Sequence, residues 1–313
     1  MLAPGIAQEI ADRFAVGSNA SVSGPAARGK LGQVWKLTTS QGDFAAKESF
    51  GPFEERDGED AAFSEAARAA GVPTPEVFRA TDGSLIVPIG EAEIRLFGWV
   101  DLREPTMGAD PGEIGALVAA LHRVPFRGTR PAHPWYFEAV GPARWDALAE
   151  ELGAAGAPFA EDLAAYRDEL VAMEELIGPP GTLRTCHRDL WADNVRTTPE
   201  GGLCVIDWDN CGPADPSQEL AVVLFEFSGG DPERARALHE AYLDSGGPGA
   251  VDGSGDFSMA IAQLGHIGEI AARTWLASET EADRTDNEAW FREFVDRPLT
   301  RALIDELLDA VTR

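Results

Sequence analysis

The sequence predicts an α+β protein of two lobes, a small antiparallel-sheet lobe over residues 1–99 and a mainly helical lobe over residues 100–313. With 313 residues, of which 44% are hydrophobic, the chain is long enough to bury a full core and is expected to form two lobes. β-like runs separated by glycine turns fill the first third of the chain, and apolar residues at helical spacing dominate the rest. The first lobe is therefore expected to hold a sheet and the second lobe most of the helices.

The first lobe is expected to open with a short amphipathic helix, because Ile6, Ile10 and Phe14 are spaced for one helix face. A second helix is expected over residues 54–70, closed by Gly71 and the prolines beyond it. Strands are expected within residues 21–48 and then over residues 76–80, 84–87 and 93–100. These strands would complete the sheet of the small lobe.

The second lobe begins with a strongly signalled helix that starts at an Asp110 N-cap, has Pro111 at its first position and ends at His122. We expect His122 to be a packed or capping histidine rather than a catalytic one. One or two helices are expected over residues 144–177, another starts at Asp215, and the chain ends in helices over residues 257–277 and 287–311.

The candidate chemistry lies between Cys186 and Leu220. Two β-like runs, residues 194–197 and 203–207, flank a turn of the Pro/Gly type at residues 198–202. This pattern predicts a hairpin with a polar loop at each end.

Three side chains with oxygen atoms lie at the ends of this hairpin, Asp189, Asn194 and Asp207. Magnesium prefers oxygen ligands in octahedral geometry, so Asn194 and Asp207 would suit it together with nucleotide phosphates and water. Asp189 is the candidate base, because a carboxylate that is not bound to metal can accept a proton from an incoming hydroxyl. The set predicts phosphoryl transfer, in which positioning and charge neutralisation do most of the work. The alternative is an Asp/Asn-rich turn without chemistry.

The segment His187-Arg188-Asp189-Leu190-Trp191-Ala192-Asp193-Asn194 matches the kinase catalytic-loop pattern H-R-D-L-x-x-x-N. Downstream the chain has Ile206-Asp207-Trp208 in place of D-F-G and no A-P-E, which disfavours a protein kinase. This combination resembles the small-molecule kinases of the aminoglycoside phosphotransferase and choline kinase group. The resemblance implies a bilobal, protein-kinase-like fold, with ATP or GTP and Mg²⁺ as cofactors.

The resemblance also assigns the nucleotide site. Lys47 would grip the phosphates, because Phe-Ala-Ala-Lys stands where kinases have V-A-I-K. Glu59 or its neighbour Asp60 would pair with Lys47, and Glu59 is favoured for its reach. The glycine loop retains only Gly29 and Gly32. The hinge that meets the nucleotide base would be Phe97, Gly98, Trp99 and Val100, although Trp99 is also compatible with ordinary core packing.

Supporting roles follow from the same resemblance. His187 and Asp215 are expected to be structural, with Asp215 holding the catalytic loop by hydrogen bonds. Arg188 stands where the aminoglycoside enzymes more often have glycine. The C-terminal helices would wall the acceptor pocket, and the candidate acceptor contacts are Glu269, Trp275, Glu279 and Glu281. The alternative for these acids is a charged helix face that is only solvated.

Charge and composition narrow the partners. The formal net charge of −27 makes nucleic acid an unlikely partner and favours a cationic small molecule, although the acids could also serve solubility. No apolar run is long enough to span a bilayer and the N-terminus lacks the basic start of a signal peptide, so a cytoplasmic enzyme is expected. The three cysteines, Cys186, Cys204 and Cys211, are expected to be small buried residues. The sequence does not indicate the oligomeric state.

The leading hypothesis is an ATP-dependent, magnesium-requiring kinase that phosphorylates a hydroxyl of an aminoglycoside or related antibiotic. One alternative is a kinase of a metabolite such as an amino alcohol, homoserine or a sugar. Another is a nucleotide-binding protein without turnover, against which the set of Lys47, Asp189, Asn194 and Asp207 argues.

Overall fold

The structure is a computed structural model, and it describes residues 6–29, 32–50 and 58–312. The chain forms two compact units. We call the first the sheet unit; it comprises Met1–Thr106, Val124–Gly128 and Asp193–Cys211. We call the second the helical unit; it comprises Met107–Arg123, Thr129–Ala192 and Gly212–Arg313. The hairpin expected in the second lobe therefore groups with the sheet, and Asp189 belongs to the helical unit.

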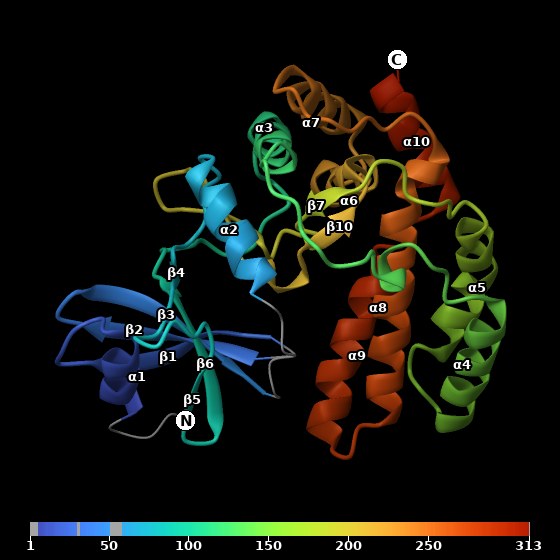
Figure 1. The fold of residues 1–313 in the computed structure, drawn as a ribbon. Coiled ribbons are helices and arrows are strands. Elements are labelled where there is room, and N and C mark those ends of the chain that lie inside the picture. The colour runs from blue at the N-terminus through green and yellow to red at the C-terminus, as the bar shows by residue number, and fades with distance from the viewer. Residues whose placement is uncertain (1–5, 30–31, 51–57, 313) are drawn as a thin grey trace. The chain divides into compact units, whose positions relative to one another are not determined.

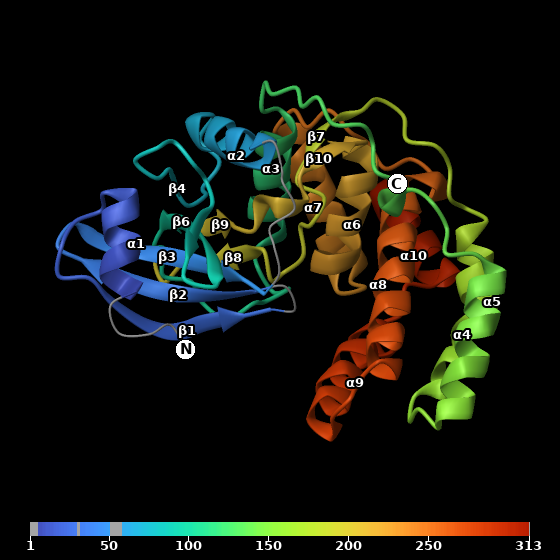
Figure 2. The same ribbon diagram turned by 60° about the horizontal axis from the view of Figure 1, so that its bottom comes forward.

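The sheet unit contains a six-stranded antiparallel sheet in the order β1-β2-β3-β6-β4, with β5 also paired to β6 (Figure 1). A separate two-stranded hairpin pairs β8 with β9 (Figure 2). The strands are β1 Ser21–Arg28, β2 Gly32–Thr39, β3 Gly42–Ser49, β4 Val77–Phe78, β5 Val87–Ile89, β6 Ala92–Gly98, β8 Val195–Thr197 and β9 Leu203–Val205. The helices are α1 Ile6–Phe14 and α2 Glu59–Ala69.

The two faces of this sheet differ in chemistry. Because side chains alternate along a strand, Leu37, Ala46 and Leu96 share one face, where they form a core with α1. Helix α1 lies beside the sheet in Figure 2. The register places Val34, Lys47 and Arg95 in a row on three neighbouring strands, out of step with that core. The sequence pattern thus directs charged groups to the other face of β3 and β6.

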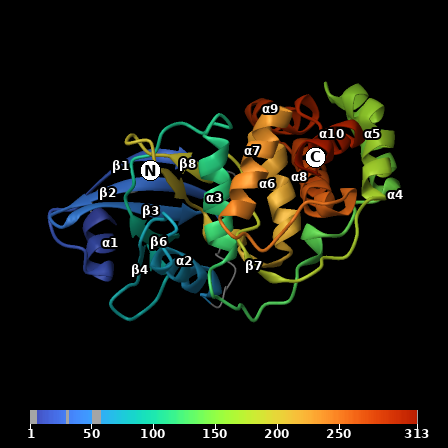
Figure 3. The same cartoon turned by 90° about the horizontal axis from the view of Figure 1, so that it is seen from above.

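The helical unit is built from helices and one small antiparallel sheet, β7 with β10. Within it, α3 packs on α7, α7 on α6, and α8 on α9 (Figures 1 and 3). Its elements are α3 Pro111–His122, α4 Pro142–Ala155, α5 Ala160–Glu174, β7 Arg184–Cys186, β10 Gly212–Ala214, α6 Pro216–Ser228, α7 Pro232–Asp244, α8 Ser258–Leu276, α9 Glu281–Asp296 and α10 Arg301–Thr312.

Local signals account for several of the helix ends. Asp110 caps α3 by accepting a hydrogen bond from the backbone N–H of Glu113 at 3.0 Å, as predicted. The prediction of one helix over residues 287–311 was wrong, because the structure has two helices there. The chain breaks between α9 and α10 around Pro298, whose ring has no N–H and restricts the residue before it.

The predicted α+β class is confirmed, with an antiparallel sheet in the first unit and mostly helices in the second. The part of the helix predicted over residues 54–57 lies outside the described residues. In the described ranges, no helix combines the length and apolar character that crossing a membrane requires.

Candidate functional site

A chain of ion pairs crosses the charged face of the sheet unit. The ammonium of Lys47 on β3 contacts Oδ1 of Asp207 at 2.7 Å and Oδ2 of Asp209 at 2.8 Å. The guanidinium of Arg95 on β6 contacts Oδ1 of Asp209 at 2.9 Å and Oδ2 of Asp60 on α2 at 2.6 Å. The structure therefore brings Lys47 and Asp207 together, and it adds three residues that sequence reasoning had not placed there in these roles.

The predicted partner of Lys47 was Glu59, and the structure corrects this assignment. Among the described residues, the charged groups that contact the Lys47 ammonium are Asp207 and Asp209. Asp60, next to Glu59 on α2, pairs with Arg95 instead. The strand register accounts for this difference, because it places Arg95 directly opposite Lys47, and Arg95 pairs with the α2 carboxylate of Asp60. A charged residue inside the buried strand segment 94–96 was the available sequence signal.

The charges around Lys47 favour its protonated form. Burial alone would lower the pKa of the ammonium, but the charges of Asp207 and Asp209 and their hydrogen bonds outweigh burial and raise it. Lys47 is therefore a cation at neutral pH.

A cavity of about 500 Å³ opens onto this ion-pair chain within the sheet unit. Its volume is in the range of small-molecule sites. The predicted hinge lines the same cavity as Lys47 and Asp207, through Phe97, Gly98, Trp99 and Val100. Trp99 is half-buried, donates from Nε1 to Asp101 at 2.8 Å and lies under the ammonium of Lys36 at 4.7 Å. It is thus a wall residue rather than part of the core.

The β8–β9 hairpin positions the proposed metal ligands. The backbone N–H of Ile206 donates to the carbonyl of Asn194 at 2.9 Å, which places Asn194 one position from Asp207 across the ladder. Asp207 itself has a φ of +58°, a left-handed conformation that ends the strand and starts the turn carrying Asp209. The hairpin thus brings an amide and a carboxylate to one end, and both are oxygen donors of the kind that Mg²⁺ prefers.

The glycines of the β1–β2 connection have structural reasons of their own. The backbone N–H of Gly29 donates to the carbonyl of Gly32 at 2.9 Å and closes the turn. A Cβ on Gly32 would lie 2.3 Å from the backbone oxygen of Glu48, so the approach of β2 to β3 requires glycine there. Residues 30 and 31 between them lie outside the described residues.

In the helical unit, the catalytic-loop segment is held at Arg188. This residue has a φ of +64°, which favours glycine, and it is buried. Its backbone N–H donates to the carboxylate of Glu219, its carbonyl accepts from Nε2 of Gln263 at 2.7 Å, and its guanidinium lies 4.0 Å from the ring centre of Tyr136. These contacts offset a backbone strain of about 1–3 kcal/mol.

Two glutamates of α6 hold the segment on both sides of Asp189. Glu219 and Glu226 are seven residues apart, so they lie on one helix face, and they accept from the backbone N–H groups of Arg188 and Ala192, the latter at 3.1 Å. Burial alone would raise the pKa of Glu219, but the hydrogen bond and charge of His122, 2.6 Å away, lower it. Sequence reasoning missed both acids; two glutamates in an otherwise apolar helix were the signal.

The residues expected to be structural are Asp215 and His187, and Asp215 makes other contacts than predicted. Asp215 caps α6 by accepting from the backbone N–H of Ser217 at 2.9 Å, and it accepts from Gly181 at 2.7 Å. Glu219, rather than Asp215, accepts a hydrogen bond from the backbone of the loop segment, at the N–H of Arg188. His187 is fully buried beside Glu219, and His122 is a packed histidine that also contacts the Tyr242 hydroxyl at 2.9 Å.

The three cysteines are buried, as predicted. Burial raises the pKa of the Cys204 thiol to about 11 and that of Cys186 well above its usual range. Cys186 lies within ligand distance of His122 and Glu219. However, the two nitrogens of His122 and both oxygens of Glu219 are already hydrogen-bonded inside the protein, so this group is a packed polar cluster.

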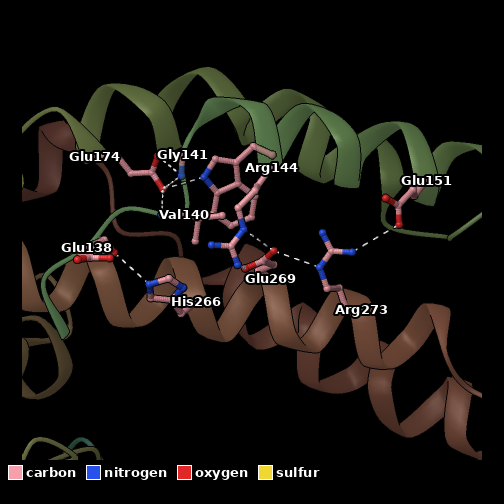
Figure 4. A network of polar contacts seen from close by, with 10 residues as sticks. Glu138, Val140, Gly141, Arg144, Glu151, Glu174, His266, Glu269 and Arg273 are labelled. Carbon is pink, nitrogen blue, oxygen red and sulfur yellow. Dashed lines mark hydrogen bonds and ion pairs between the residues drawn. The ribbon is translucent and has the colours of Figure 1, made fainter. Parts of the chain in front are cut away.

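The four candidate acceptor residues lie in two different environments. Glu269 is buried between the guanidinium groups of Arg144 and Arg273, as Figure 4 shows. Trp275 is buried against Phe159, with ring centres 5.4 Å apart. Glu279 and Glu281 are exposed. The charge of Glu269 is therefore balanced within the protein, whereas the other two acids face solvent.

Known structures share this fold. An aminoglycoside phosphotransferase from Alicyclobacillus acidocaldarius is 17% identical, with 99% of this chain and 97% of that chain covered and a TM-score of 0.64. A spectinomycin phosphotransferase solved with ADP and spectinomycin is 14% identical, with 99% and 98% covered and a TM-score of 0.66. The choline kinase LicA from Streptococcus pneumoniae is 16% identical, with 93% and 99% covered and a TM-score of 0.58. The fold is that of small-molecule kinases.

The sequence itself defines the family. The model of the phosphotransferase enzyme family matches residues 24–253, which is more than half of the chain. The chain therefore belongs to the phosphotransferase enzyme family, and the predicted resemblance is confirmed. No curated protein matches the sequence.

Replacing Glu226 tests how the catalytic-loop segment is held. We expect Glu226→Ala to raise amide hydrogen exchange in residues 188–192 about tenfold, because losing an acceptor for the Ala192 N–H costs about 1–2 kcal/mol. Glu226→Gln keeps an acceptor oxygen and should restore most of the protection. Glu240→Ala, an exposed acid on α7, is the control. Unchanged exchange in Glu226→Ala would show that Glu226 does not hold the loop.

Replacing Glu269 separates a structural role from acceptor binding. We expect Glu269→Gln to lower the free energy of unfolding by about 1–3 kcal/mol, because two guanidinium groups lose the carboxylate between them. Urea unfolding measures this change. Glu150→Gln, an exposed acid on α4, should stay within about 0.5 kcal/mol of the wild type. Equal stability of the two variants would contradict the structural role.

Proposed function

We propose that the protein is an ATP-dependent O-phosphotransferase that acts on a hydroxyl of a small molecule. The observation that carries this proposal is the contact of Lys47 with Asp207 at the wall of a 500 Å³ cavity that the hinge segment also lines. Family membership supports phosphoryl transfer, and the ADP bound to the spectinomycin enzyme supports a purine nucleotide as donor. GTP is the alternative donor.

The roles of the chain's own groups follow from their chemistry. Lys47, a cation at neutral pH, would balance the charge of the nucleotide phosphates. The base would lie against Phe97, Gly98, Trp99 and Val100. Asp189, half-buried five residues before Asn194, would orient the acceptor hydroxyl and take its proton as the oxygen attacks the γ-phosphorus. Asp215 would support these groups indirectly, by capping α6, and His187 would do so by its packing beside Glu219.

Asn194 and Asp207 are the residues that would hold Mg²⁺. The Asp207 side chain is 41% exposed and uses Oδ1 for Lys47, which leaves Oδ2 for a cation. An amide oxygen and a carboxylate oxygen at one hairpin end fit the donor set of a magnesium ion that keeps several waters. When bound, Mg²⁺ would neutralise the phosphates and orient them for transfer.

We propose a cationic acceptor, most specifically an aminoglycoside or a related antibiotic, and hence a role in antibiotic resistance. The net charge of −27 would attract such a molecule, and the exposed acids Glu279 and Glu281 remain candidate contacts. Glu269 and Trp275 would support the acceptor wall from behind. The alternative acceptor is a metabolite such as an amino alcohol, homoserine or a sugar, in keeping with the choline kinase likeness. Because the reaction consumes ATP, we place it in the cytoplasm.

A phosphorylation screen separates these acceptors. Cationic antibiotics and the metabolites would be incubated with the protein, ATP and Mg²⁺, and ADP release would be recorded. ADP release with an antibiotic alone supports the resistance role, and release with a metabolite alone supports the metabolic one. A protein that binds ADP but releases none with any acceptor, and shows no basal ATP hydrolysis, would be a binding protein without turnover.

Asp189 is the decisive position for the mechanism. We expect Asp189→Asn to lower turnover about 10²- to 10⁴-fold, because the amide cannot accept the hydroxyl proton, while ADP affinity stays within about twofold. Asp193→Asn removes an exposed carboxylate from the same segment and should leave turnover near the wild-type value. Calorimetry measures binding, and ADP release with the acceptor found in the screen measures turnover. Wild-type turnover in Asp189→Asn would refute the role.

A further inference from the structure

We propose that Asp60 and Arg95 are positioning residues of the nucleotide site, through which helix α2 acts on Lys47 by way of Asp209. Direct pairing between a helix carboxylate and the lysine was the expectation, and the structure has an arginine and a second aspartate in between. This inference rests on the proposed function, because it takes Lys47 to contact the nucleotide phosphates. It gives Asp60, Arg95 and Asp209 roles that the expected lysine–glutamate pair does not include.

The relay is continuous in its geometry. Asp60 binds Arg95 at 2.6 Å, Arg95 binds Asp209 at 2.9 Å, and Asp209 binds Lys47 at 2.8 Å. Asp209 joins the two cations with its two oxygens, Oδ1 toward Arg95 and Oδ2 toward Lys47. In the described part of the chain, Lys47 forms its hydrogen bonds with Asp207 and Asp209 and Asp60 bonds Arg95, so these links are the bonded route from Asp60 to the lysine.

Burial makes the inner part of this relay rigid. The side chain of Asp60 is 2% exposed and that of Arg95 is 5% exposed, whereas Lys47 and Asp209 are about one fifth exposed at the cavity wall. A buried guanidinium is tolerated only when charged acceptors satisfy it, and here Asp60 and Asp209 both contact Nη1 of Arg95. The relay therefore runs from a buried anchor on α2 to a lysine that the cavity can reach.

The strand register explains why carboxylates are needed beside Lys47 and Arg95. Lys47 and Arg95 are directly opposite each other on β3 and β6, and like charges in that position repel. Asp209 lies between them and cancels this repulsion, while Asp60 balances the far side of Arg95. Asp60 is in the first turn of α2, where the helix dipole also favours an anion. Without Asp60, Arg95 would draw Asp209 away from Lys47.

The two aspartates of Ile206-Asp207-Trp208-Asp209 then have different duties. Both oxygens of Asp209 are committed to cations of the protein, so it serves as the bridge of the relay. Asp207 gives one oxygen to Lys47 and is the more exposed of the two, at 41% against 22%. The relay thus reserves Asp207 for the ligand side of the site.

A double-mutant cycle tests the proposal. The wild type, Asp60→Asn, Lys47→Met and the double variant would be titrated with ADP in EDTA by calorimetry. We expect each single substitution to weaken ADP binding about tenfold, and the double variant to be about as weak as Lys47→Met alone, because Asp60 would act only through Lys47. Independent effects would multiply to about a hundredfold and would overturn the relay.

Two further variants serve as a control on helix α2 and as a test of Arg95. Glu65→Gln, on the same helix, removes one partner of an exposed pair with Arg79 and should bind ADP as the wild type does. Arg95→Lys keeps the charge, but its ammonium lies one bond nearer the backbone than Nη1, the atom that contacts both carboxylates, so it should weaken ADP binding and abolish the coupling between positions 60 and 47. If Asp60→Asn fails to fold, the same cycle is run with Arg95→Lys in its place.

The outcomes separate this inference from the proposed function. A wild type that does not bind ADP would contradict the proposed function itself. Binding that Lys47→Met weakens but Asp60→Asn leaves unchanged would retain the function and overturn the relay. A larger loss in Glu59→Gln than in Asp60→Asn would restore the direct helix–lysine pair and also overturn it.

Discussion

Two cations side by side on one face of a sheet are the constraint around which the cavity wall of the sheet unit is built. Lys47 and Arg95 are directly opposite each other on adjacent strands, and neither could stay charged in this place without nearby anions. Asp60, Asp207 and Asp209 supply those anions from a helix and from the turn after a hairpin. Pairing the charges therefore also fixes α2 and the hairpin turn to the sheet.

In the helical unit, buried carboxylates hold the backbone of a loop rather than charged side chains. The loop segment with Asp189 contains Arg188 in a left-handed conformation that an arginine adopts only under constraint. The Glu219 carboxylate accepts a hydrogen bond from the backbone N–H of Arg188. A Cβ on Gly212 would lie 2.5 Å from the guanidinium of Arg188. Gly212 thus leaves space for the Arg188 side chain. The contacts of Arg188 with the rest of the helical unit offset the backbone strain that a glycine at position 188 would not have.

Much of this arrangement could be predicted from local sequence. The caps of α3 and α6, the β8–β9 hairpin and the catalytic-loop motif each depend on residues within a few positions of one another. The lysine and the hinge followed from a resemblance, and they line one cavity as that resemblance implied. Local patterns and motif spacing carry this information because the chemistry of caps, turns and loops is itself local.

The pairing of charges could not be predicted in the same way. Whether Glu59 or Asp60 faces the sheet depends on the rotation of α2, and one residue changes that direction by about 100°. What the helix acid meets depends on Arg95, whose importance appears only when the register of β3 and β6 is known. A one-residue change of register would turn Arg95 into the core with α1 and leave Asp60 and Asp209 without it. The motif thus indicates which groups are candidates for the chemistry, and the long-range register determines which charged groups pair around Lys47.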